Sequence, residues 1–115
     1  MRKIALIIVT TFAICAFAAD SAVKGYLVDL SCAAEEGTNP GFGVKHSKGC
    51  LQMEDCEKSG YGVLTDDKKV IRFDKAGNDE AKKFIAALTK KNDIKVTVTG
   101  AVKGEEMTVS KIELQ

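Results

Sequence analysis

The chain has 115 residues, with 17 basic and 16 acidic side chains, one histidine and four cysteines. This length allows one domain at most, and lysines and acids alternate along the chain instead of gathering in one block. A protein that binds a phosphate backbone needs clustered positive charge, so the pattern argues against a nucleic-acid partner.

The N-terminal segment has the layout of a secretory signal peptide. Arg2 and Lys3 precede the uncharged run IALIIVTTFAICAFAA, residues 4–19, which ends in small residues. As a helix this run would cover about 24 Å, less than the roughly 30 Å of a bilayer core, and an uncleaved anchor is the alternative. We therefore expect removal of residues 1–19, leaving residues 20–115 as a single periplasmic or secreted domain without a stable membrane anchor.

The next segment predicts a strand, a loop and a short helix. Residues 23–32, VKGYLVDLSC, are rich in β-formers and predict the first strand. Residues 33–45 hold three of the ten glycines and the only proline, which predicts an irregular loop. A helix is expected over residues 48–58, because Ser47 suits its N-cap and Gly60 its C-terminal stop.

A hairpin and the clearest helix follow. Residues 62–65 and 70–74 predict two strands joined by the turn DDKK. Residues 78–91, NDEAKKFIAALTKK, predict an amphipathic helix, because their apolar residues recur with helical spacing. The expected core residues of this helix are Ala81, Phe84, Ile85 and Leu88.

The last two segments predict a second hairpin. Residues 94–102 alternate strictly, and the turn KGEE leads into a final strand over residues 107–114. In that strand the apolar positions change phase between Val109 and Ile112, which predicts a β-bulge or a strong bend.

The predicted order of elements indicates a fold class. It is mainly β with some α: five strands, a helix between strands 3 and 4, and a cysteine- and histidine-bearing insert after strand 1. This order matches a five-stranded barrel of the OB type. An α+β sheet covered by one helix is the alternative topology.

Several segments resemble small exported bacterial proteins with OB-like folds. They are GYLVDLSC, the histidine and cysteine pattern after it, and the later SGYGV and VTVTG. The most specific part is the D-x-x-C end of the first strand, followed by HxxxCxxxxxC. The resemblance implies an OB-like fold and export, and it implies no particular reaction.

Three cysteines lie beyond the signal segment, an odd number for an exported chain. Together with the single histidine they are the donor set of a tetrahedral Cys3His metal site, so Cys32, His46, Cys50 and Cys56 are the candidate ligands. Zinc suits this set. Copper(I) also accepts thiolates, and Met53 is a further thioether candidate.

A disulfide is the competing use of these thiols. On a continuous helix Cys50 and Cys56 would lie about 9 Å apart along the axis, too far for a bridge, so Cys32 would pair with one of them. A redox-active thiol is a third interpretation. A single histidine and the lack of paired, pocket-like carboxylates leave the chain short of groups for acid–base catalysis.

We therefore expect an exported, non-enzymatic binding module whose Cys/His cluster holds zinc or copper. Its partner would be a protein or a small ligand. A disulfide-stapled interaction domain of the OB type, with no metal, is the alternative function.

Overall fold

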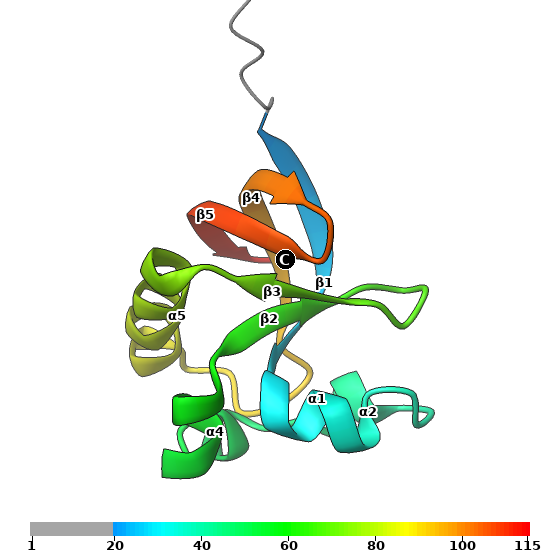
Figure 1. Ribbon diagram of the computed structural model, residues 1–115. Coiled ribbons are helices and arrows are strands. Elements are labelled where there is room, and N and C mark those ends of the chain that lie inside the picture. The colour runs from blue at the N-terminus through cyan, green and yellow to red at the C-terminus, as the bar shows by residue number, and fades with distance from the viewer. Residues whose placement is uncertain (1–19) are drawn as a thin grey trace, which may run out of the picture.

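The computed structural model describes residues 20–115, and the predicted signal peptide, residues 1–19, lies outside this range. Five strands form one sheet that closes into a ring in the order β1-β2-β3-β5-β4 (Figure 1). The strands are β1 (Ser21–Asp29), β2 (Tyr61–Leu64), β3 (Val70–Phe73), β4 (Lys95–Lys103) and β5 (Glu106–Leu114). The predicted five-stranded, mainly β architecture is confirmed.

The first strand pairs with two neighbours, and this closes the ring. Its first half, through Tyr26, is antiparallel to β4, and its second half, which ends at Asp29, is antiparallel to β2. On the far side of the ring β3 runs parallel to β5, with Arg72 opposite Glu106 and Phe73 opposite Met107. The end of β1 is thereby held beside the start of β2.

Alternate side chains fill the interior of the ring. In β4, Val96 and Val98 are fully buried whereas Lys95 is exposed, as expected for a strand with one buried face. The core is apolar, and its buried members are Leu27, Leu51, Tyr61, Val63, Phe73, Ala81, Ile85, Leu88, Ile94, Val96, Val98, Met107 and Val109.

Helix α5 (Lys75–Ala87) follows β3 in the chain and packs against β5 along the side of the ring (Figure 1). It starts before the predicted span of 78–91, because the side chain of Asp74 accepts a 2.9 Å hydrogen bond from the N–H of Gly77 and caps the helix. It also ends earlier, since the backbone of Leu88 is extended. Both predicted ends are wrong.

The predicted core face of this helix is largely buried. Ala81 and Ile85 are buried, and Leu88, just beyond the last turn, is also buried. Phe84, in contrast, is only partly buried and packs at the margin of the core. Ile85 is therefore the main apolar anchor of α5.

The segment between β1 and β2 forms four short helices that gather at one end of the ring, below it in Figure 1. They are α1 (Leu30–Glu36), α2 (Phe42–Lys45), α3 (Lys48–Leu51) and α4 (Glu54–Ser59). The prediction of an irregular loop over residues 33–45 is wrong, because this segment contains most of α1 and all of α2. The predicted helix over 48–58 is divided into two.

Two local features explain these differences. The first strand stops at Asp29, not at Cys32, because the Asp29 carboxylate accepts a hydrogen bond from the N–H of Cys32 and begins a helix. The helix predicted over residues 48–58 is interrupted at Met53, whose backbone is extended. The predicted N-cap at Ser47 is confirmed, since its hydroxyl accepts from the N–H of Cys50.

The predicted bulge in the last strand is also confirmed. Thr99 pairs with Lys111, whereas the next residue, Gly100, pairs with Val109, so Ser110 is the extra residue. No helix within residues 20–115 has the length and apolar character needed to span a bilayer.

Candidate metal centre

A buried carboxylate, Asp29, forms the centre of the site. It is the last residue of β1, lies opposite Tyr61 of β2, and is fully buried. Its Oδ2 atom accepts a 2.9 Å hydrogen bond from the N–H of Cys32, and the N–H of Leu30 donates to the carbonyl of Gly60 at 3.0 Å. These two bonds fix the position of the carboxylate where the chain turns from strand into helix.

His46 faces this carboxylate from the end of α2. Its Nε2 atom lies 2.7 Å from Oδ1 of Asp29, and the side chains are 4% and 0% exposed, respectively. The contact is close, but neither atom has a hydrogen bond of good geometry. The ring of Phe42 packs against the imidazole, with ring centroids 4.9 Å apart. The imidazole is therefore held in a buried position against an acidic oxygen.

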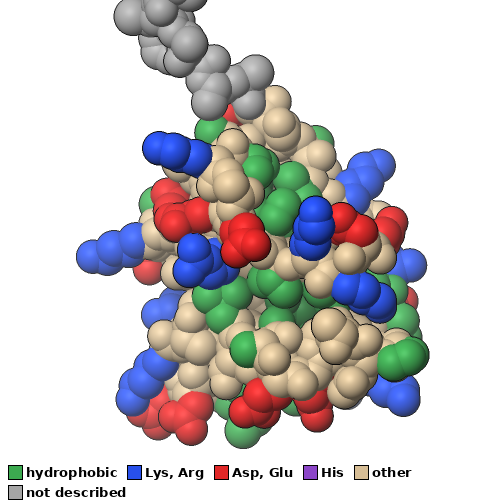
Figure 2. Space-filling view, turned by 45° about the vertical axis from the view of Figure 1, so that its right-hand side comes forward, with side chains coloured by type: hydrophobic (Ala, Val, Ile, Leu, Met, Phe, Trp, Pro, Cys, Tyr) green, Lys and Arg blue, Asp and Glu red, His purple; other side chains and the backbone are tan. Residues whose placement is uncertain are grey.

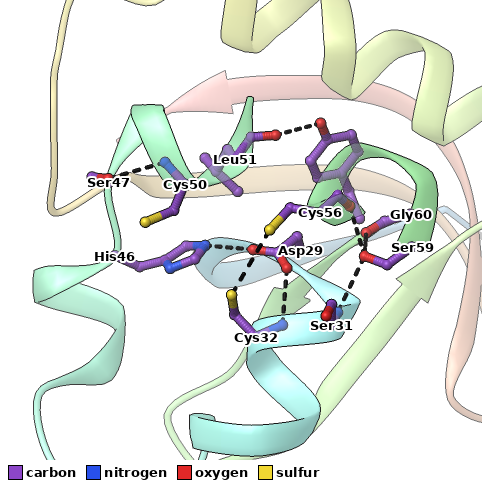
Figure 3. Close-up of polar contacts among 11 residues, drawn as sticks. Asp29, Ser31, Cys32, His46, Ser47, Cys50, Leu51, Cys56, Ser59 and Gly60 are labelled. Atoms are coloured by element: carbon purple, nitrogen blue, oxygen red, sulfur yellow. Dashed lines mark hydrogen bonds and ion pairs between the residues drawn. The ribbon is translucent and has the colours of Figure 1, made fainter. Parts of the chain in front are cut away.

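Two thiols lie next to this pair (Figure 3). Cys32 is in the first turn of α1 and Cys56 is in α4, and their Sγ atoms are 3.9 Å apart. This exceeds the roughly 2.05 Å of a disulfide. It is close to the separation of about 3.8 Å between two thiolates at 2.3 Å from one tetrahedral zinc ion.

The two helices that carry these thiols are tied together by hydrogen bonds. The hydroxyl of Ser59 accepts from the N–H of Ser31 at 3.1 Å and donates to the carbonyl of Cys56 at 2.6 Å. The hydroxyl of Tyr61 donates to the carbonyl of Leu51 at 2.7 Å, which anchors the segment before α4 to β2. The spacing of the thiols thus depends on a fixed frame.

Within residues 20–115, one group of potential ligands is close enough to share a metal ion. Asp29, Cys32 and Cys56 each offer one ligand atom, and these atoms all lie within 4.8 Å of one another. His46 joins the group through its contact with Asp29. Three donors, one oxygen and two sulfurs, therefore meet at one end of the ring, and the imidazole of His46 touches this group at Asp29.

Cys50 has a different environment. It lies on α3, is partly exposed, and lines a cavity of about 290 Å³ together with His46, Phe42 and Lys45. It is not part of the close group. Met53 lies in the break between α3 and α4 and is 58% exposed, so it is not a core residue.

The electrostatics of the site hold the carboxyl ionised and the thiols protonated. Burial raises the pKa of Asp29, but the contact with His46 and the hydrogen bond from Cys32 lower it more, to about 2. Burial, and then the charge of Asp29, raise the pKa of Cys32 to about 12, and the same two causes raise the pKa of Cys56. The thiols are therefore not activated nucleophiles, and a cation beside them would reverse this balance.

Of the residues predicted from the sequence, the structure brings Cys32 and Cys56 into contact and places His46 beside them through Asp29. Cys50 shares a cavity with His46 without joining the close group. Asp29 was missed as a site residue. Its signal is the acid of D-x-x-C, a charge that ends a run of otherwise apolar strand residues.

Comparison with known proteins gives no relative from which a function could be carried over: no family model, no curated protein and no solved structure matches this chain.

Proposed function

We propose that this protein is an exported, non-enzymatic binding module that holds one transition-metal ion, zinc or copper, at one end of a barrel of the OB type. The observation that carries the proposal is the 3.9 Å separation of the Cys32 and Cys56 sulfur atoms beside a buried carboxylate and imidazole. Burial of a carboxylate is unfavourable unless positive charge lies beside it, and a bound cation would supply that charge to the carboxylate and to the two thiolates together.

The topology supports the OB-type assignment. The ring order β1-β2-β3-β5-β4, the parallel pairing of β3 with β5, and a helix between β3 and β4 are consistent with a five-stranded Greek-key barrel. The proposed site lies in the insert between β1 and β2. In such a protein the barrel is the scaffold and the insert supplies the ligands.

The surface supports a partner other than a nucleic acid. On the face shown in Figure 2, blue basic and red acidic side chains are interspersed, with no uniform basic area. Exposed ion pairs between the described residues include Lys58 with Glu54 and Lys82 with Glu57. A mixed surface of this kind gives little release of counterions from a phosphate backbone.

The same thiol contact supports one second candidate. The metal-free alternative is a domain stapled by a Cys32–Cys56 bridge, with Cys50 left over; its formation requires the two sulfurs to close from 3.9 Å to about 2.05 Å. Export permits such a bond. The raised pKa of both thiols argues against the third interpretation, a redox-active thiolate.

Mass measurement of the exported protein distinguishes the candidates. The metal proposal expects a chain that begins near Asp20, carries one metal ion under native conditions, and loses it on denaturation. Its denatured mass should correspond to three free thiols. A denatured mass lower by two hydrogens, with no metal in the native state, would support the disulfide. A chain that still begins at Met1 would contradict export with cleavage.

A further inference from the structure

The predicted ligand set of three thiols and one imidazole is not the set that the structure brings closest together. The close group contains the carboxylate of Asp29 with the thiols of Cys32 and Cys56, and His46 contacts that carboxylate. Resting on the proposed metal-binding function, we propose that the metal is zinc, bound by Asp29, Cys32, His46 and Cys56, with Cys50 outside the coordination sphere.

The first support is the state of the Asp29–His46 pair. One oxygen of Asp29, Oδ2, is occupied by the N–H of Cys32, whereas Oδ1 and the facing Nε2 of His46 are buried without a hydrogen bond of good geometry. They are 2.7 Å apart. Two ligands at 2.0–2.1 Å from a tetrahedral zinc ion are separated by about 3.3 Å, so a small opening of this contact would admit the ion.

The second support is the frame around the four donors. Asp29 ends β1, Cys32 is in the first turn of α1, His46 follows α2, and Cys56 lies in α4. The backbone N–H of His46 donates to the carbonyl of Phe42 at 2.9 Å. Each donor therefore comes from a separate element with a fixed backbone, as a preorganised site requires.

The third support is the position of Cys50. Its side chain is partly exposed, lines a cavity together with His46 and Lys45, and does not belong to the close group of Asp29, Cys32 and Cys56. A closed structural zinc site uses four protein ligands: the close group supplies three, and His46, which contacts Asp29, would be the fourth. Cys50 is thus left as a partly exposed thiol, which Figure 3 shows beside His46 and apart from the Cys32–Cys56 pair.

The donor types determine the metal. A carboxylate oxygen and an imidazole nitrogen beside two thiolates form a mixed set that suits zinc. Copper(I) favours soft sulfur donors and gains little from a carboxylate. Replacement of the third thiolate by Asp29 therefore selects zinc over copper(I).

Cobalt(II) substitution tests the ligand set, because the intensity of thiolate-to-cobalt charge transfer reports the number of bound thiolates. We expect Cys50→Ser to keep the charge-transfer intensity of the unmodified protein and its zinc affinity within threefold. Cys56→Ser should lose at least half of that intensity. The protein isolated from its exported location should contain zinc.

Asp29 has a matched control in the same chain. Asp74 also caps a helix, through a 2.9 Å bond to the N–H of Gly77, and belongs to α5 rather than the insert. Asparagine is as good a cap as aspartate, so both Asp29→Asn and Asp74→Asn should fold. Only Asp29→Asn should weaken zinc binding, by tenfold or more.

Three results would overturn this inference while leaving the proposed function intact. They are loss of about a third of the charge-transfer intensity in Cys50→Ser, equal zinc affinity in Asp29→Asn and Asp74→Asn, or copper in place of zinc in the isolated protein. Failure of the unmodified, reduced protein to bind cobalt, zinc or copper(I) would instead refute the metal-binding function itself.

Discussion

At the scale of single residues, the most informative feature is a charge at the end of a buried strand. Asp29 is fully buried, caps α1 with one oxygen and contacts His46 with the other. A buried charge is tolerated when it is paired and hydrogen-bonded. Its removal leaves both the imidazole and the backbone N–H of Cys32 without a partner.

Asp29→Ala should therefore destabilise the metal-free protein by about 3–5 kcal/mol, as expected when one member of a buried pair is lost. Asp74→Ala is the control, because it removes a helix cap and a longer bond from the N–H of Val109 but no buried ion pair, and it should cost about 1–2 kcal/mol. Urea unfolding of the reduced proteins in chelator measures both. Equal losses for the two variants would show that the contact of Asp29 with His46 does not stabilise the fold.

The lowered pKa of Asp29 also predicts how stability depends on pH. Its pKa is about 2 in the folded protein against a reference value of 3.8, so its contribution is present above pH 3.8 and is lost as the pH falls through about 2. Chemical unfolding of the metal-free protein between pH 5 and 2 should show this decline. Asp29→Asn should show a smaller decline over the same range, and an unchanged decline would contradict the assignment.

At the scale of elements, α5 contributes to the core through fewer side chains than its sequence indicates. The apolar spacing predicts one buried face made of Ala81, Phe84, Ile85 and Leu88. In the structure Phe84 lies at the margin of the core and is only partly buried. Ile85 is 1% exposed and lies within the main cluster. Burial against β5, not side-chain size, determines which residue stabilises the helix.

Ile85→Ala should consequently cost about 2–5 kcal/mol, the usual range for deletion of a buried aliphatic side chain. Phe84→Ala should cost less, although phenylalanine is the larger residue, and the exposed control Lys83→Ala should change stability by less than about 0.5 kcal/mol. Thermal and urea unfolding of the three variants give this order directly. A larger loss for Phe84→Ala than for Ile85→Ala would mean that α5 is rotated relative to the ring.

At the scale of the whole molecule, the proposed metal should couple the insert to the barrel. The four proposed donors come from β1, α1, α4 and the residue after α2. One ion would therefore add a link between elements that hydrogen bonds and the apolar packing of Val28, Ala33, Phe42 and Leu64 already join. A ligand that binds only the folded state stabilises it in proportion to the logarithm of its concentration relative to the dissociation constant.

Zinc at 100 times its dissociation constant should raise the stability of the reduced protein by about 2.7 kcal/mol. An excess of chelator should lower the melting temperature to that of the metal-free chain. Because the thiols are protonated near neutral pH, zinc binding should also release protons and weaken in acid. If a Cys32–Cys56 bridge forms instead, reductant should lower the melting temperature and chelator should leave it unchanged.

Local patterns in the sequence were sufficient for the strands, for the Ser47 cap and for the bulge near Ser110. Side-chain alternation, turn residues and a change of phase act over a few neighbouring positions, so they can be read along the chain. The sequence also predicted that Cys32, His46, Cys50 and Cys56 converge; the structure brings Cys32 and Cys56 together and leaves Cys50 outside the close group. The proposed signal peptide rests on sequence alone, since the structure describes residues 20–115.

Tertiary structure decided the rest of the site. Cys32 and Cys56 are 24 positions apart, and their contact depends on the pairing of β1 with β2, which brings α1 beside α4. In the sequence, Asp29 is an ordinary residue at the end of a strand. Only the fold shows that its carboxylate is buried against His46. The caps at Asp29 and Ser47 are local, but Leu51, just before the break at Met53, is buried in the core and its carbonyl accepts from the hydroxyl of Tyr61, ten positions away. A short window of sequence does not contain these contacts.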